Sequence, residues 1–333
     1  MNVLVIGLGS AGQRHLRILS DISQGDWEIY VYRGNHKRGL ISIDLKEENL
    51  DIDPIHFYGA CELSEVAEMA SKKWDLVIIA TPPDSHLSYL QLSYLYADRI
   101  LIEKPVASDL ESATKIQNLA ITNDKSILIG YQMHFHKVIQ DLLEWIPKLG
   151  EIELCRTVFS EKLSSMNPFR DMKHHHLSSF EGGGVFLGLS HDLDIVIKLF
   201  EGKSVNSLES KSIERNSVGA IVECEVSFFL HNEAKSIPIE GFFSCSRDLK
   251  SRVITIIGSK GVLDFDLNTQ LLTIKNTGDE VIFERQYSIS KDQLFSDQIK
   301  YLIGIYGLND FCSENLERSM LISRMNEQLW SIH

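Results

Sequence analysis

The first twelve residues place the strongest constraint on the fold. Residues 2–6 form a short apolar run, and the glycine-rich run GLGSAG at residues 7–12 follows without a gap. His15, Leu16 and Leu19 then begin an apolar pattern with helical spacing. A buried strand that turns through glycines into a helix is the opening unit of a doubly wound α/β sheet. The sequence therefore predicts a Rossmann domain, with a parallel sheet, that begins at the first residue.

Each glycine of this run has a separate physical task in such a domain. Gly7 permits a tight turn, Gly9 lets the backbone approach a pyrophosphate, and Gly12 lets the helix pack closely on the strand. The amide groups at the start of the helix, at Ser10 and Ala11, offer a partial positive charge to phosphates. A glycine turn also occurs in α/β domains that bind no nucleotide. The strand before it and the helix after it favour a nicotinamide dinucleotide site.

The second apolar run ends without an acidic residue. Residues 27–32 are expected to form the second strand, which in NAD-binding domains usually ends in an Asp or Glu that binds the ribose hydroxyls. Arg33 stands there instead, and His36, Lys37 and Arg38 follow. Because a guanidinium binds phosphate in bidentate fashion, Arg33 favours NADP(H), with its 2′-phosphate, while NAD(H) stays possible. The alternative is a solvated basic turn that contacts no ligand.

Strands and helices alternate through the rest of the first 130 residues. Further strands are expected at 75–80, 99–102 and 126–129, and helices at 62–70, 85–96 and 109–123. Such alternation produces crossover connections and a parallel sheet. We predict that residues 1–125 form an NAD(P)-binding domain.

The pattern changes after about residue 130. Helices are expected at 137–147 and 191–200, strands at 152–159, 221–230, 236–244, 252–257, 262–266, 271–275 and 280–286, and a helical tail from 291. Successive strands joined by short turns indicate a largely antiparallel sheet. We predict that residues 126–333 form an α+β domain with a large, mostly antiparallel open sheet.

The composition argues against several classes of partner. At 333 residues the chain exceeds the usual size of one core, which favours two domains. A formal charge of -13 repels nucleic acid and anionic membranes. No apolar run reaches the roughly 18 residues of a spanning helix, and the start resembles no secretory leader. Five widely spaced cysteines favour reduced thiols over a disulfide or zinc framework, so a cytoplasmic protein is expected.

Five motifs, taken in order, resemble the glucose-fructose oxidoreductase / inositol dehydrogenase (Gfo/Idh/MocA) family. They are GLGSAGQRH, ATPPDSH, EKPVA, GYQMHFH and GGG…HDLD, and together they span essentially the whole chain. The resemblance implies an NAD(P)-dependent oxidoreductase that acts on a CH–OH group of a carbohydrate-like substrate. It also implies that one face of the second domain's sheet forms an interface between subunits, in a homodimer or homotetramer.

The same resemblance assigns places to individual residues. It puts Thr81, Pro82, His86 and Glu103 beside the cofactor, and Lys104 between the nicotinamide and the substrate. The bond between Lys104 and the proline that follows is often cis in the family.

The chemistry requires a group that exchanges the hydroxyl proton while hydride moves. Lys104, at a strand end with Pro105 fixing the turn, suits the polarisation of the reacting oxygen; alternatively it is an exposed lysine paired with Glu103. His191 can exchange a proton near neutral pH, and Asp194 lies on the same helical face three residues later. The alternative for His191 is a histidine that caps the helix or completes the core.

One position departs from the family. An aspartate that assists proton transfer commonly precedes the family's histidine, and Gly188 stands in its place here. Either Asp171, Asp192 or Asp194 replaces it, or the chemistry is altered or lost. In the second case the protein is a non-catalytic dinucleotide-binding sensor or regulatory subunit.

Six residues are predicted to contact the substrate: Tyr131, Gln132, His134, Arg170, Asp171 and Lys173. The first three follow the last Rossmann strand, where open sheets bind ligands, although interdomain packing is the alternative for them. The last three are expected at the rim of the cleft. The run His174-His175-His176 is expected to be a polar loop, because consecutive residues rarely all face one metal ion; no metal site is predicted.

Overall fold

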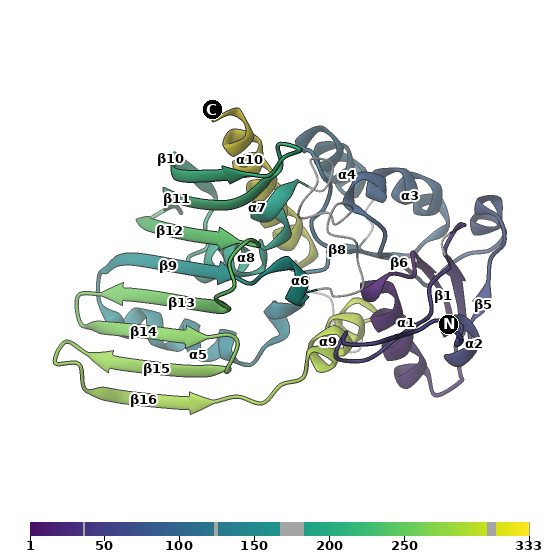
Figure 1. The fold of residues 1–333 in the computed structure, drawn as a ribbon, viewed down its shortest axis with the longest axis horizontal. Coiled ribbons are helices and arrows are strands. Elements are labelled where there is room, and N and C mark those ends of the chain that lie inside the picture. The colour runs from purple at the N-terminus through teal and green to yellow at the C-terminus, as the bar shows by residue number, and fades with distance from the viewer. Residues whose placement is uncertain (36, 123–125, 167–182, 305–310, 333) are drawn as a thin grey trace. The chain divides into compact units, whose positions relative to one another are not determined.

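The computed structural model describes residues 1–35, 37–122, 126–166, 183–304 and 311–332. These residues form two compact units (Figure 1). The first unit contains Met1–Gln132 and Lys291–Met320, and the second contains the described residues of 133–290 together with the chain from Leu321. The units thus divide after Gln132, and the chain from Lys291 onward contributes to both.

A six-stranded parallel sheet forms the core of the first unit. Its strands are β1 (Asn2–Ile6), β2 (Glu28–Tyr32), β5 (Cys61–Glu62), β6 (Leu76–Ile79), β7 (Arg99–Ile102) and β8 (Ser126–Ile129). The spatial order is β5-β2-β1-β6-β7-β8. Strand β1 is buried from Val3 to Ile6 because both of its faces are covered. The chain leaves β1 toward β2 on one side and returns on the other side at β6, which is the topological switch point where doubly wound sheets bind ligands.

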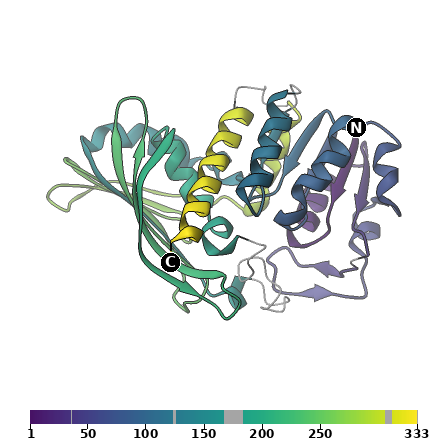
Figure 2. The same ribbon diagram turned by 90° about the horizontal axis from the view of Figure 1, so that it is seen from above.

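Helices cover this sheet. They are α1 (Ser10–Ser23), α3 (His86–Ser93), α4 (Leu110–Thr122), α9 (Lys291–Leu302) and the first part of α10 (Phe311–Ser331), with short 3-10 turns η1 (Val66–Ala70), η2 (Pro83–Ser85) and η3 (Tyr94–Tyr96). Helix α1 packs against α9, and α3 packs against α4; Figure 2 shows α3 and α4 side by side in blue.

The segment between β2 and β6 differs from the sequence prediction. It contains the small hairpin of β3 (Leu40–Ile41) and β4 (Glu48–Asn49), then the short helix α2 (Pro54–Phe57). The helix predicted at 62–70 is replaced by β5 and the 3-10 turn η1. Short elements of this kind carry too few apolar repeats to be detected from periodicity.

An eight-stranded sheet forms the second unit. Its strands are β9 (Ile152–Ser160), β10 (Ser204–Arg215), β11 (Ile221–His231), β12 (Ser236–Ser244), β13 (Ser251–Gly258), β14 (Gly261–Asp266), β15 (Leu271–Asn276) and β16 (Val281–Gln286). The order is β10-β11-β12-β9-β13-β14-β15-β16, and all neighbours are antiparallel except β9 and β12. The α/β and α+β classes predicted from the sequence are confirmed. Edge strand β10 was missed, since Val205, Leu208 and Ile213 are its only apolar residues.

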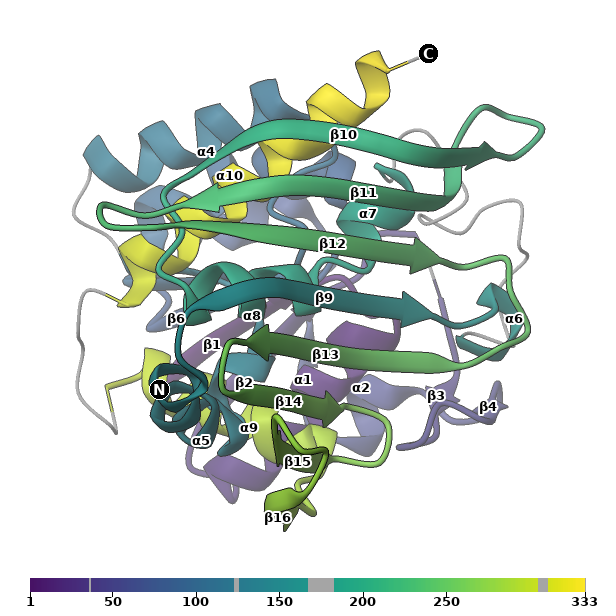
Figure 3. The ribbon, with the colours of Figure 1, turned by 90° about the vertical axis from the view of Figure 1, so that its left-hand side faces the viewer.

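Helices lie on one face of this sheet. They are η4 (Gln132–Phe135), α5 (Val138–Trp145), η5 (Ile146–Leu149), α6 (Leu163–Met166), α7 (Gly184–Gly188) and α8 (His191–Leu199). Figure 3 looks onto the other face, where none of the described helices stands in front of the strands. Cys224, Val226 and Phe228 of β11, at alternate positions, are buried at 0–2% exposure and therefore belong to the covered face. Among the described residues, no helix is both long enough and apolar enough to span a bilayer.

Candidate functional site

Two positions of the glycine turn at the carboxyl end of β1 require glycine. Gly7 has φ +92°, in the left-handed region, and a Cβ on it would lie 2.6 Å from the carbonyl oxygen of Ala80. A Cβ on Gly12 would lie 2.1 Å from the carbonyl oxygen of Gly7. The amide of Gly7 donates to the carbonyl of Tyr32 at 2.8 Å. The turn is thus closed tightly between the ends of β1, β2 and β6.

The N-terminus of α1 suits an anion. Gly9 is the N-cap residue and supplies no side chain to the first amides, and the first turn holds no acidic residue. Ser10 and Ala11 are half-buried beside it. A helix start with uncapped amides and a positive dipole end binds phosphate groups. The residues present therefore fit the pyrophosphate of a dinucleotide.

The segment from Thr81 to His86 lies against this turn. The Thr81 methyl group is 2.9 Å from the place that a Cβ on Gly7 would take. The ring of His86 is fully buried, with Nε2 2.9 Å from the Thr81 carbonyl and Nδ1 3.2 Å from the Val106 carbonyl. Burial lowers the pKa of His86. His86 therefore fixes the backbone of this segment, whereas Pro82 is exposed.

Glu103, the residue before the predicted catalytic Lys104, makes a buried contact within the first unit. The carboxylate of Glu103 lies 2.7 Å from Nε2 of His15, and both side chains are largely buried. Burial alone would raise the pKa of Glu103, but His15 and the charge of Lys104 hold it below its usual value. The bond between Lys104 and Pro105 is cis, as expected, and Lys104 itself is half-buried.

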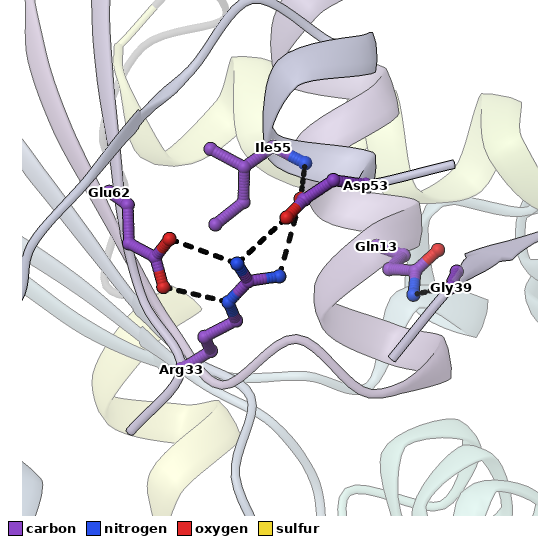
Figure 4. Close-up of polar contacts among 6 residues, drawn as sticks. All are labelled: Gln13, Arg33, Gly39, Asp53, Ile55 and Glu62. Atoms are coloured by element: carbon purple, nitrogen blue, oxygen red, sulfur yellow. Dashed lines mark hydrogen bonds and ion pairs between the residues drawn. The ribbon is translucent and has the colours of Figure 1, made fainter. Parts of the chain in front are cut away.

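Arg33 lies in an ion-pair cluster at the end of β2 (Figure 4). Its Nε and Nη2 donate to the Glu62 carboxylate at 2.7 and 2.9 Å, and its Nη1 and Nη2 donate to the Asp53 carboxylate at 3.2 and 2.8 Å. The sequence favoured NADP(H) because a guanidinium at this position can bind a 2′-phosphate. In the structure both carboxylates already bind the Arg33 guanidinium.

Gln13 ties the inserted hairpin to α1. Its side-chain nitrogen donates to the Gly39 carbonyl at 2.8 Å, and its oxygen accepts from the Ile41 amide at 2.8 Å. Arg38 is bound on the same hairpin by Glu48 at 2.8 Å. Sequence reasoning missed Gln13, Asp53 and Glu62. Only Asp53 carried a signal, since an Asp before Pro54 is typical of a helix N-cap.

The second unit contains the predicted proton-transfer residues. His191 begins α8 and is half-buried. The carboxylate of Asp194 contacts Nε2 of His134, and neither side chain is exposed. Asp192, one of the possible replacements for the family aspartate, is also buried, and it pairs with Arg252 of β13 at 2.5 Å. Gly188 ends α7 and is buried.

The residues predicted to contact substrate fall into two groups. Tyr131 is 1% exposed, His134 is buried, and Gln132 is half-buried. Arg170, Asp171, Lys173 and the run His174–His176 lie outside the described residues. Within the described part of the chain, no group of three or more His, Cys, Asp or Glu side chains could hold a metal ion.

A sugar dehydrogenase is similar to part of this chain. D-xylose 1-dehydrogenase [NADP(+)] of Haloarcula marismortui is 31% identical over 104 residues, which are 31% of this chain and 29% of that protein. The alignment thus covers less than a third of the relative.

Solved structures match over nearly the whole chain. UDP-N-acetylglucosamine 3-dehydrogenase GnnA from Acidithiobacillus ferrooxidans has a TM-score of 0.71 at 16% identity, covering 99% of this chain and 96% of that one. A super-repressor mutant of Gal80p from Saccharomyces cerevisiae has a TM-score of 0.76 at 15% identity, covering 99% and 95%. At these identities the likeness establishes a shared fold.

The N-terminal domain also matches a family model. Residues 1–131 match the model of the Gfo/Idh/MocA oxidoreductase family, described as having an NAD-binding Rossmann fold. This stretch contains the glycine turn, the Thr81 segment and the Glu103–Lys104 pair. Over these residues the chain is similar to the Gfo/Idh/MocA family of oxidoreductases.

Proposed function

We propose that the protein is an NAD(P)-dependent oxidoreductase acting on a CH–OH or keto carbon of a sugar, sugar acid or nucleotide sugar. The observation that carries the proposal is the turn from Gly7 to Gly12. No Cβ fits at either of these two glycines, and the helix that follows begins without a side-chain cap. The sugar substrate is supported by the names of two similar proteins, a D-xylose dehydrogenase and a UDP-N-acetylglucosamine dehydrogenase. Residues 1–125 would hold the cofactor, and residues 126–333 would supply most of the substrate contacts.

The chain's own residues would manage the proton. A bound nicotinamide gives or takes the hydride. The ammonium of Lys104 polarises the substrate oxygen, and His191 takes the hydroxyl proton in oxidation or returns it in reduction. Asp194 contributes through α8, whose first turn it shares with His191, while its carboxylate contacts His134. Thr81, Pro82, His86 and Glu103 shape the cofactor side of the site.

A second candidate function rests on Gly188. It supplies no side chain where the family commonly has an aspartate, and the fold is shared with Gal80p. A sensor of this kind would bind the dinucleotide without turnover. The half-buried Lys104 and His191 favour the enzyme.

Two measurements on purified protein separate the candidates. Fluorescence titration measures the dissociation constants of NADH and NADPH, and stopped flow with saturating cofactor measures single-turnover hydride transfer on a panel of sugars and nucleotide sugars. For an enzyme, Lys104→Ala and His191→Ala should bind cofactor as the wild type does but transfer hydride about 10²–10⁴-fold more slowly. Their losses should not simply add, because the two groups serve one proton.

The matched control is Lys115→Ala, an exposed lysine on α4 paired with Glu111. It should leave the transfer rate unchanged. Wild-type transfer rates in both variants would overturn the proposed roles, and tight cofactor binding without transfer on any member of the panel would support the sensor.

A further inference from the structure

The ion-pair cluster around Arg33 lies at the position where a Rossmann domain distinguishes NAD(H) from NADP(H). The adenosine ribose of a bound dinucleotide lies at the end of the second strand, and Arg33 is the first residue after β2. The hydrogen bond from the Gly7 amide to the Tyr32 carbonyl places this strand end beside the glycine turn. Arg33, Asp53 and Glu62 are therefore next to the ribose position.

The cation of this cluster is covered, and the anions face solvent. The Arg33 side chain is 4% exposed, whereas the side chains of Asp53 and Glu62 are 34% and 38% exposed. An incoming phosphate would meet two carboxylates before it reached the guanidinium. The three side chains together carry one positive and two negative charges, a net charge of -1.

The hydrogen-bonding capacity of Arg33 is also largely used. Its guanidinium has five N–H groups, and four hydrogen bonds run from it to the two carboxylates. The carboxylates are held independently as well. Asp53 caps α2 by accepting from the Ile55 amide at 2.9 Å, and Glu62 belongs to β5, which pairs with β2. The fold therefore stabilises the paired state of Arg33.

The arrangement suits ribose hydroxyls better than a phosphate. Exposed carboxylate oxygens accept hydrogen bonds from hydroxyl groups, which is how NAD-binding sites usually recognise the ribose. Here the acids come from β5 and from the cap of α2 instead of from β2. Arg38 does not supply a substitute cation, because Glu48 binds it.

We propose that Asp53 and Glu62 make this site select NAD(H) over NADP(H), by occupying Arg33 and presenting carboxylates where a 2′-phosphate would bind. This inference rests on the proposed function, since it requires a dinucleotide at the glycine turn. The two carboxylates would favour NAD(H) by repelling a 2′-phosphate as much as by accepting hydrogen bonds from the ribose hydroxyls.

Equilibrium titration of NADH and NADPH, followed by nucleotide fluorescence, tests the proposal without any substrate. The wild type should bind NADH about tenfold or more tightly than NADPH. Glu62→Gln and Asp53→Asn remove one negative charge each while keeping hydrogen-bonding groups. Each should tighten NADPH binding several-fold, and the double variant more, while NADH affinity changes little. Adding Arg33→Ala to the double variant should abolish the gain, because the gain comes from the released guanidinium.

Glu28→Gln is the matched control, since Glu28 lies at the opposite end of β2. This variant makes the same change in charge and should leave the ratio of the NADH and NADPH dissociation constants unaltered. Two results would overturn the proposal: a wild type that binds NADPH as tightly as NADH, or a Glu62→Gln ratio equal to the wild-type ratio. Tighter NADPH binding that disappears in Lys37→Ala would assign the 2′-phosphate to the exposed Lys37 instead. A folded protein that binds neither nucleotide would defeat the proposed function itself, and this inference with it.

Discussion

The imidazole of His15 and the carboxylate of Glu103 meet at 2.7 Å in the interior of the first unit. His15 belongs to the helix that starts at the glycine turn, and Glu103 precedes Lys104. The pair therefore connects the predicted phosphate-binding element to the predicted catalytic residue through one buried contact. Loss of this contact should therefore lower the free energy of unfolding more than it weakens any single ligand contact.

We predict that Glu103→Gln lowers the free energy of unfolding by about 1.5–3 kcal/mol, the usual worth of a hydrogen bond to a charged group. Urea denaturation at neutral pH measures it. Glu111→Gln is the control, because Glu111 has a 2.6 Å contact with Lys115 but is 80% exposed. Its loss should stay below about 0.5 kcal/mol. Equal losses in the two variants would contradict a structural role for the His15–Glu103 pair.

Gly12→Ala should weaken dinucleotide binding. The added Cβ would lie 2.1 Å from the Gly7 carbonyl oxygen, so the turn must open and move the amides that are proposed to bind the phosphates. We expect at least about a tenfold loss of affinity for both NADH and NADPH. Gly278→Ala is the control, since its Cβ would approach only the Asn276 side chain, at 3.3 Å. Unchanged binding by Gly12→Ala would show that the phosphates lie elsewhere.

Asp194→Ala and His191→Ala should separate folding from chemistry. Asp194 and His134 are both 0% exposed, so removal of one partner should cost about 3–5 kcal/mol of stability. Removal of the half-buried His191 side chain should lower the free energy of unfolding by about 1 kcal/mol or less. Chemical denaturation measures both, and a double-mutant cycle with His134→Ala measures the coupling within the pair. If His191→Ala proves the more destabilising change, the histidine belongs to the core.

His86 should make the protein less stable in mild acid. Burial depresses its pKa in the folded state, so below the unfolded value of about 6.5 the unfolded chain binds a proton that the folded chain does not. This part of the stability is full above pH 6.5 and is lost as the pH falls from there toward the folded pKa. Urea denaturation at pH 7.5 and 5.5 should show a smaller difference for His86→Asn than for the wild type. Equal differences would mean that the folded histidine titrates normally.

The sheet face without helices is proposed to associate with a second copy. Phe242 of β12, Val158 of β9 and Val253 of β13 pair across neighbouring strands and form an apolar row, and all three are half-buried. An apolar sheet face of this kind usually marks an interface. Light scattering should show a homodimer or homotetramer for the wild type, and smaller species for Val158→Asp.

The control for that experiment is Val281→Asp, on edge strand β16, where the valine is 49% exposed. It should keep the wild-type mass. A wild type that is monomeric at micromolar concentration would remove the basis for this association.

Local pattern alone predicted most of the regular structure. Strands β1, β7 and β8 lie at the predicted residues, because a continuous apolar run between polar turns has few other stable states. The glycine turn was equally well specified, since the spacing of Gly7, Gly9 and Gly12 reflects steric limits within one βα unit. The cis bond at Lys104–Pro105 followed from the family resemblance, and periodicity carried no sign of it.

What only the tertiary structure decided is which charged groups meet. Arg33 was separated from Asp53 by 20 residues and from Glu62 by 29, and His134 from Asp194 by 60. No periodic signal connects such positions, because ion pairs depend on the register of strands and the placement of caps. The sequence determined that a cation stands at the end of β2. The fold determined that two carboxylates already bind it, since β5 and the start of α2 are brought to the same edge of the sheet.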